Sequence, residues 1–302
     1  MANIVLKIDI DTLQGTLKGV PQLLDLLSRA SVSATFLFSL GPDHTGWALR
    51  RIFRPGFLKK VSRTSVVSHY GLKTLLYGVL LPGPDIGKKA AAIIKEVSNQ
   101  KHEAGVHCWD HVLWQDNVRA KNQAWTAKQM TLARNRFIDI FGHVPTTFGS
   151  AGWQTNIFAL QQLDDWQVLY ASDGRGTAPY RIDYGSHLAQ HIQIPTTLPT
   201  CDELLGTNGI DENNLAQSIL NLTENDQDQV FTLHAELEGM QLASVFSTLL
   251  MGWKAQGHQL LSMEEYFKKM DCTNLPSYPL SFGTVAGRSG LLMTQTPSNS
   301  IE

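Results

Sequence analysis

The sequence contains little cysteine, with only Cys108, Cys201 and Cys272 among its 302 residues. An odd number of widely spaced cysteines argues against a disulfide framework and favours a reducing compartment. Long apolar runs are also lacking, because the uncharged apolar stretches Thr74–Pro84 and Gly239–Trp253 are shorter than the roughly 18 to 20 residues that span a bilayer. The N-terminus lacks the basic start, apolar stretch and cleavage site of a signal peptide. We therefore expect no disulfides, no transmembrane helix and no signal peptide.

Charged residues are sparse as well, at 17% against 43% hydrophobic residues, and the formal net charge is only -2. This ordinary globular composition excludes a fully disordered chain and the fibrous classes. The length suffices for one large α/β domain or two small ones with a deep core.

One segment departs from this mild charge balance. Residues 50–89 contain nine Lys or Arg and a single acid, Asp85, which gives a local net charge of +8 and leaves -10 for the rest of the chain. Apolar residues such as Phe53, Phe57 and Leu80 lie between the cations. This mixture favours an anionic membrane surface as partner, and a solvated basic face packed on the core is the alternative. No nucleic-acid-binding motif accompanies the segment, so we expect no nucleic acid partner.

Strand-like and helix-like segments alternate along the chain. Apolar, β-branched runs that end at polar residues predict strands over 4–10, 33–40, 104–107, 146–148, 167–171, 191–195 and 229–234. Helical patterns cover 20–30, 87–100, 122–140, 215–222 and 242–255. This alternation predicts a parallel α/β sheet or barrel.

Polar residues fall at the carboxyl ends of the predicted strands, namely Asp9, Asp11, His107, Asp173 and His234. In a barrel of parallel strands these ends converge on one mouth, where active sites are built. The sequence therefore predicts a candidate active site at that mouth.

Asp9 and Asp11 are two residues apart, so on a strand both carboxylates point to the same face. One could bind a metal while the other acts as a base. Asp226 and Asp228 repeat the spacing, and a solvated strand end is the alternative interpretation of either pair.

His107 and His111 are four residues apart, which on a helical turn would stack both imidazoles on one face within reach of one cation. A pair of structural histidines is the alternative. Cys108 stands where HExxH proteases carry glutamate, which excludes that protease helix. One Asp and two His would leave a divalent metal with open positions for water and substrate. His234 could donate a proton to a leaving group, with Asp173 orienting its ring, or could be a core histidine.

The order of these motifs resembles the polysaccharide deacetylase superfamily, also called the NodB-homology family. Its members carry an Asp pair on the first strand, an HxxxH, a turn after a middle strand, an Asp-containing segment and a late Leu-x-His. From Lys7 to about Gly290 the chain is similar, within this superfamily, to deformylases of lipid-linked formamido sugars. The most specific segments are HCWDH and IPTTLPTCDELLG, followed by KIDIDTLQGTLKGVPQLLDLL, SAGWQTN, YASDGRG, HAELEG and GTVAGRSG.

The resemblance implies an α/β fold, a distorted (β/α) barrel of about seven parallel strands over residues 1–282. A basic amphipathic insert at about 41–90 would interrupt it, and 283–302 would form a C-terminal loop and tail. The resemblance also implies one divalent metal ion. Zinc, cobalt and manganese all suit one Asp and two His.

Carried over by position, the resemblance makes Asp11, His107 and His111 the metal ligands, Asp9 the general base and His234 the general acid. From their positions alone, supporting or substrate-binding roles are expected for Asp173, Arg175, Trp109, Trp153 and Glu236. The chain departs from the superfamily pattern at Gln154, where Arg is usual, and at Val112, where a further His often follows HxxxH.

The resemblance implies removal of formyl from 4-deoxy-4-formamido-L-arabinose carried on undecaprenyl phosphate. The enzyme would be peripheral, at the cytoplasmic face of the inner membrane, with residues 50–82 docked on the anionic surface. Its product would modify lipid A and confer polymyxin resistance. The alternatives are a deacetylase of another N-acylated sugar or polysaccharide, and a catalytically silent lipid-binding homologue.

Overall fold

The computed structural model describes residues 2–48 and 72–296. The strands are β1 (Asn3–Ile10), β2 (Thr35–Ser39), β3 (Glu103–Cys108), β4 (Thr147–Phe148), β5 (Tyr170–Ala171), β6 (Arg181–Asp183), β7 (Ile192–Gln193), β8 (Gln229–His234), β9 (Gln259–Leu261), β10 (Ser277–Pro279), β11 (Ser281–Gly283) and β12 (Leu292–Thr294). The α-helices are α1 (Val20–Ala30), α4 (Leu72–Leu76), α5 (Ile86–Lys89), α6 (Ala91–Asn99), α7 (His111–Asn117), α8 (Gln123–Phe141), α9 (Ile157–Asp165), α10 (Cys201–Leu204), α11 (Leu215–Asn221), α12 (Ala243–Ala255) and α13 (Met263–Lys269). Short turns of other helix types are η1 (Gly15–Gly19), η3 (Val118–Ala120), η4 (Ala151–Trp153) and η5 (Leu237–Gln241).

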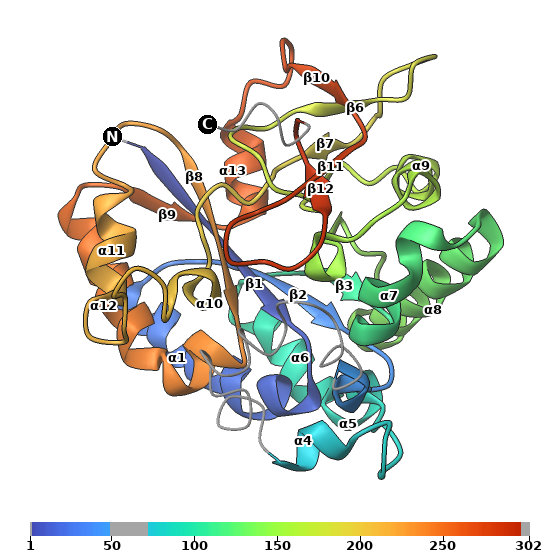
Figure 1. Ribbon diagram of the computed structural model, residues 1–302, viewed down its shortest axis with the longest axis horizontal. Coiled ribbons are helices and arrows are strands. Elements are labelled where there is room, and N and C mark those ends of the chain that lie inside the picture. The colour runs from blue at the N-terminus through green and yellow to red at the C-terminus, as the bar shows by residue number, and fades with distance from the viewer. Residues whose placement is uncertain (1, 49–71, 297–302) are drawn as a thin grey trace.

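Parallel strands in the order β7-β5-β4-β3-β2-β1-β8 form the central sheet, with β9 paired to the start of β1 (Figure 1). The sheet curls, and the backbone N–H groups of Thr197 and Leu198, which follow β7, both donate to the carbonyl oxygen of Val230 in β8 (3.1 and 3.2 Å). The prediction of a distorted barrel of about seven parallel strands is therefore confirmed. Two small sheets, β6 with β10 and β11 with β12, lie beside it.

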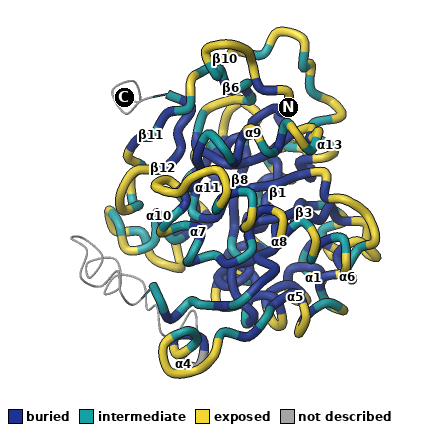
Figure 2. The backbone as a smooth tube through the Cα atoms, turned by 90° about the vertical axis from the view of Figure 1, so that its right-hand side faces the viewer, coloured by how far each residue is buried: buried dark blue, intermediate teal, exposed yellow. Residues whose placement is uncertain are grey.

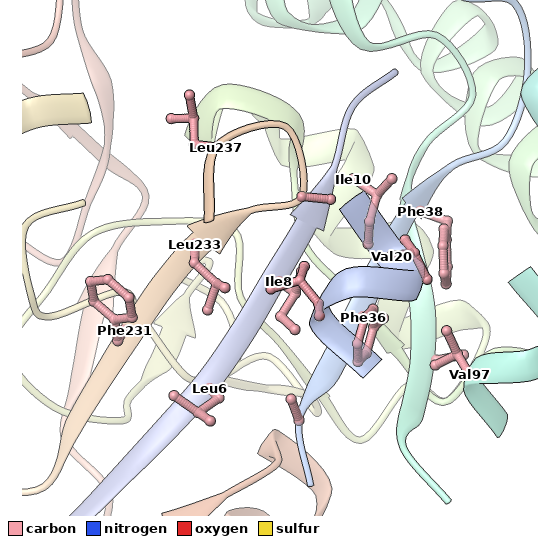
Figure 3. Packing of buried hydrophobic residues seen from close by; sticks show 14 of the residues in the cluster. Leu6, Ile8, Ile10, Val20, Phe36, Phe38, Val97, Phe231, Leu233 and Leu237 are labelled. Atoms are coloured by element: carbon pink, nitrogen blue, oxygen red, sulfur yellow. The ribbon is translucent and has the colours of Figure 1, made fainter. Parts of the chain in front are cut away.

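The two faces of β1 differ in chemistry. Ile8 and Ile10 point outward into the main core, where they meet Val20 of α1 and Phe36 and Phe38 of β2 (Figure 3). The intervening residues face the barrel interior, because successive side chains of a strand alternate between faces. The interior series is Val5, Lys7 and Asp9, all buried, so it changes from apolar to charged towards the carboxyl end of the strand.

Several predicted boundaries agree with the structure, and others do not. Helix α1 has the predicted bounds, and α8 begins after Asn122, whose side chain accepts the Trp125 N–H. The helix predicted over 87–100 is broken at Ala90 into α5 and α6, because Ala90 leaves the helical conformation (φ -117°, ψ 13°). Helices α9 and α13 and strand β9 were not predicted.

The C-terminal region is more ordered than the sequence suggested. A loop and tail were expected over 283–302, but β12 lies within this range and pairs antiparallel with β11. Met293 in β12 is fully buried, and its carbonyl oxygen accepts the backbone N–H of Arg175 (2.9 Å). The expectation of a loop is therefore wrong for Leu292–Thr294, where a short apolar run supplies strand residues.

The basic insert is described only in part. Phe53 and Phe57, two of the apolar residues expected to meet the membrane, lie outside the described residues. Beyond them, Leu75 of α4 is buried, whereas Leu80 in the following turn is 76% exposed. Figure 2 shows the chain next to α4 coloured as exposed. Across residues 2–48 and 72–296, no helix combines the length and apolarity that crossing a bilayer requires.

A buried carboxylate, Glu103, joins α13 to the amino-terminal end of the barrel. It accepts hydrogen bonds from the Tyr170 hydroxyl, from Thr35 Oγ1 and from the backbone N–H of Glu264 in α13. Burial raises the pKa of Glu103 to about 7, although these hydrogen bonds act in the opposite direction. The folded protein therefore keeps this proton at pH values where the unfolded chain has lost it.

We expect this proton to make stability depend on pH. The free energy of unfolding should fall as pH rises from about 4.5 to about 7, since only the folded state holds the proton there, and the effect should level off above that window. Glu103→Gln removes the titration, so the wild type should lose about 2 to 3 kcal/mol relative to this variant across the window. Urea denaturation at several pH values measures the difference, and a pH-independent difference would contradict the assignment.

Candidate active site

Three potential metal ligands meet at the mouth of the barrel. Asp11 follows β1, His107 belongs to β3 and His111 is the first residue of α7. One ligand atom from each lies within 4.8 Å of the others. The Nε2 atoms of His107 and His111 are each 3.3 Å from a different carboxylate oxygen of Asp11. The structure therefore brings together the three residues predicted to bind metal.

The local structure that pairs the two histidines differs from the prediction. His107 lies on a strand and His111 starts a helix, so they do not share a helical turn. The β2–β3 register shifts between Phe38 and Ser39, and such a bulge redirects side chains near active sites. Asp110 then begins α7 by accepting the Leu113 N–H (3.0 Å). The rings stack with centroids 5.4 Å apart, so the predicted proximity is correct although the helical geometry is wrong.

The hydrogen bonds around this cluster suit a divalent cation. His107 Nδ1 donates to the Gly149 carbonyl oxygen (2.7 Å), which leaves the Nε2 lone pair facing Asp11 Oδ1. That carboxylate oxygen is buried and accepts no hydrogen bond. A nitrogen lone pair and a carboxylate oxygen at 3.3 Å repel each other unless positive charge lies between them. One carboxylate and two imidazoles are ligands that zinc, cobalt and manganese accept.

The electrostatics of the cluster favour positive charge. Burial by itself would raise the pKa of Asp11, but the charges of His111 and His107 hold it below its usual value. Burial by itself would lower the pKa of His107, but the charges of Asp9 and Asp11 raise it. Each group thus stabilises the charged form of its neighbour, so the surroundings favour positive charge.

Asp9 and His234, the predicted base and acid, flank the cluster. They are register partners on the neighbouring strands β1 and β8. Asp9 Oδ1 is buried without a hydrogen bond and lies 3.9 Å from His107 Nδ1. His234 Nδ1 is likewise buried without a partner, while the His234 backbone N–H donates to Glu238 Oε2 (2.8 Å). Both side chains thus carry an uncommitted proton-accepting or proton-donating atom at the mouth.

Lys7 was missed by the sequence reasoning. Its ammonium lies 3.2 Å from Asp9 Oδ2, and its side chain is fully buried. The signal was available, because Lys7, Asp9 and Asp11 occur at every second position and therefore share a face of a strand.

Asp173 was expected to orient the His234 ring, but its hydrogen bonds go to other residues. Its Oδ1 accepts the backbone N–H and the hydroxyl of Ser150 (2.9 and 2.8 Å), and its Oδ2 accepts the side-chain amide of Gln193 (2.8 Å). Ser150 follows Gly149, whose carbonyl oxygen accepts the hydrogen bond of His107. By holding Ser150, Asp173 therefore supports the backbone that orients one of the candidate metal ligands. In the turn at 148–152, the backbone N–H groups of Gly149 and Ser150 are already hydrogen-bonded, so neither is free to bind substrate.

Arg175 and Trp153, predicted to bind substrate, are both buried. The Arg175 guanidinium donates to Glu203 Oε1 (2.6 Å) and lies 5.0 Å from the centre of the Trp153 ring. Arg288 binds the same Glu203 oxygen (2.7 Å) and lies 4.7 Å from the same ring. These contacts form one wall of the barrel. Gln154, the departure from the superfamily Arg, binds the Leu291 carbonyl oxygen (2.7 Å) on this wall.

Glu236 holds the backbone that carries Asp11. Its Oε1 accepts the N–H groups of Asp11 and Thr12 and the Thr12 hydroxyl (3.1, 2.9 and 2.8 Å). Burial, reinforced by the charge of Asp11, raises the pKa of Glu236 to about 8. Trp109 lies under the Arg136 guanidinium at 5.2 Å from its ring centre, and Val112 is buried in α7.

Comparison with solved structures defines the class of protein. A polysaccharide deacetylase structure from Mycobacterium smegmatis aligns with a TM-score of 0.63 over 92% of this chain and 93% of its own, at 15% identity. A family 4 acetyl xylan esterase from Clostridium thermocellum, in complex with a cobalt ion, aligns with a TM-score of 0.51 over 88% and 90% of the chains, at 14% identity. The fold is that of the polysaccharide deacetylases.

Sequence relatives define the family more closely. A protein of Shewanella sediminis, named 4-deoxy-4-formamido-L-arabinose-phosphoundecaprenol deformylase ArnD, is 36% identical over 96% of this chain and 93% of its own length. A Wigglesworthia glossinidia brevipalpis protein of the same name is 32% identical over 93% and 98%. No family model matches the chain. The chain belongs to the ArnD deformylase family and is a hydrolase that acts on an amide bond.

We predict that His107→Ala abolishes high-affinity metal binding, because it removes the imidazole that Gly149 orients towards Asp11. Loss of an oriented ligand should weaken metal affinity by about 100-fold or more. Metal analysis by mass spectrometry after gel filtration measures this. His187→Ala, at an exposed histidine, is the matched control and should retain the wild-type metal content. Full occupancy in His107→Ala would remove His107 from the ligand set.

Proposed function

We propose that this protein hydrolyses the formamide of 4-deoxy-4-formamido-L-arabinose linked to undecaprenyl phosphate, releasing formate and the lipid-linked amino sugar. The observation that carries the proposal is the Asp11, His107 and His111 cluster, flanked by Asp9 and His234 at one mouth. The names of the two relatives support the substrate. The amino sugar would then modify lipid A and lower its negative charge, giving polymyxin resistance.

The reaction needs a water molecule to add to the formyl carbon and the carbon–nitrogen bond to break. Asp11, His107 and His111 would hold a divalent cation, which supplies Lewis acidity when bound. Asp9 Oδ1, which accepts no hydrogen bond, would take the proton from the attacking water. His234 would deliver a proton to the sugar nitrogen as it departs, since an amine anion leaves poorly. The products are formate and the amine.

A lipid-linked substrate requires the enzyme to work at a membrane surface, and we propose that the described end of the basic insert docks there. Large apolar side chains are exposed in and after α4, namely Leu76, Val79, Leu80 and Leu81. Inserting these side chains into the headgroup region would remove their apolar surface from water and so favour binding to the membrane. The neighbouring basic residues would meet anionic lipid. We propose that the protein works in this way as a peripheral enzyme at the cytoplasmic face of the inner membrane.

Direct contacts connect this segment to the candidate metal site and support the docking. The Trp47 indole N–H donates to the Gly78 carbonyl oxygen (2.7 Å), and the Trp47 ring stacks on His44 with centroids 3.9 Å apart. His44 Nδ1 lies 2.5 Å from Asp110 Oδ2, and Asp110 directly precedes His111. The exposed apolar segment and the mouth are therefore held in a fixed relation, which a substrate anchored in lipid requires.

The direct test is formate release from the lipid-linked formamido sugar by the purified protein. We expect activity that a chelator abolishes and added zinc, cobalt or manganese restores. Asp9→Asn should keep its metal but lose about 100-fold or more in kcat, because the proton acceptor is gone. Matched N-acetyl sugars should react poorly. Preference for them would identify a deacetylase instead, and metal binding without hydrolysis of either would indicate a silent homologue.

For the membrane, we expect Leu80→Asp to weaken binding to vesicles of phosphatidylglycerol and phosphatidylethanolamine by about tenfold, because a charged side chain replaces a buried apolar one. The exposure of Leu80 means that the change should not affect folding. Met251→Asp on α12 is the matched control, since Met251 is 63% exposed outside this segment. Vesicle flotation measures both, and equal binding by the two variants would reject the docking segment.

A further inference from the structure

The interior of the barrel contains a lysine, Lys7, whose surroundings are unusual for a charged side chain. It is fully buried in the middle of β1. Its ammonium lies 3.2 Å from Asp9 Oδ2 and 3.4 Å from the Ser172 carbonyl oxygen, to which it donates a hydrogen bond. The Trp153 ring lies across from it, with its centre 5.5 Å from the ammonium nitrogen.

The two threonine hydroxyls beside Lys7 on the neighbouring strands bind other groups. The register partners of Lys7 are Thr35 on β2 and Thr232 on β8. The Thr35 hydroxyl is bound to Glu103, and the Thr232 hydroxyl to that of Thr196 (2.6 Å). A buried ammonium is costly unless it is paired and hydrogen-bonded, and Asp9 supplies the paired charge while the Ser172 carbonyl oxygen accepts a hydrogen bond.

The two oxygens of Asp9 consequently differ. Oδ2 is held by Lys7. Oδ1 accepts no hydrogen bond and lies 3.9 Å from Nδ1 of His107, one of the three candidate metal ligands. A carboxylate held at one oxygen has a defined orientation for the other. Arg175 and Arg288 lie against the Trp153 ring at 5.0 and 4.7 Å and hold it beside the lysine.

We infer that Lys7 is a positioning residue for the hydrolysis, which holds Asp9 by Oδ2 so that Oδ1 receives the proton of the attacking water. The inference rests on the proposed function in that Asp9 must be the base. Lys7 itself touches neither water nor substrate in this role. Without it, Asp9 would turn towards the Asp11, His107 and His111 cluster and leave the orientation that proton transfer needs.

The variant Lys7→Met keeps the length and volume of the side chain and removes its charge. We expect kcat for formate release to fall about 100-fold, as general-base misplacement does, with KM within about threefold of wild type. Metal content should stay at the wild-type level. Lys7→Arg keeps a cation next to Asp9 and should recover kcat to within about tenfold of wild type. Metal loss in Lys7→Met, or equal losses in both variants, would overturn the inference.

A double-mutant cycle separates positioning from a general structural role. If Lys7 acts through Asp9, then Lys7→Met should reduce kcat little further in an Asp9→Asn background, whereas independent effects would multiply. Multiplying losses would overturn the inference. Lys7→Gln, which retains a hydrogen-bond donor, takes the place of Lys7→Met in the cycle if the methionine variant does not fold.

A crystal structure of metal-loaded Lys7→Met tests the inference without an activity measurement. We expect the Asp9 carboxylate to move by about 1 Å or more, the scale of displacement that disables a catalytic group. An unmoved Asp9 would overturn the positioning role, whatever the substrate proves to be. Conversely, a wild-type enzyme that releases no formate would reject the proposed function while leaving this structural outcome to decide the role of Lys7.

Discussion

Side chains alternate along β1 between the helix-covered face and the interior of the barrel, and this alternation governs where the chemistry lies. Outward residues such as Ile8 join the main core, while Lys7 and Asp9 point inward. A slip of one residue in the pairing with β8 would exchange the two sets and bury charges among the helices. The register that pairs Asp9 with His234 therefore fixes the fold and the site together.

Buried carboxylates next to the site hold backbone in place rather than perform chemistry. Glu236 accepts the N–H groups after β1, Asp43 accepts the Leu13 N–H (2.9 Å), and Asp173 accepts that of Ser150. Burial raises the pKa of Asp43 even though these bonds oppose it. Each such bond removes a backbone donor that would otherwise be buried without a partner. These hydrogen bonds hold the loop that carries Asp11 and the turn that contacts His107.

The sequence was sufficient for the parallel fold and for bringing Asp11, His107 and His111 together at the strand ends, because these depend on strand order and on where each strand stops. It was insufficient where a side chain finds its partner through space. Asp173 binds Ser150 and Gln193, and Arg175 binds Glu203. The sequence does not predict these contacts, because they depend on how the strands curl. The β-bulge at His107 and the break at Ala90 arise from local backbone geometry that periodicity does not show.

Trp153 lies between Arg175 and Arg288, and Glu203 binds both arginines through a single oxygen. The candidate metal ligands and the candidate proton-transfer residues all precede Arg288 in the chain, as does Lys7. During synthesis these groups therefore leave the ribosome before the second guanidinium that lies against the Trp153 ring. The surroundings of that ring are completed only after the candidate reactive groups have been made.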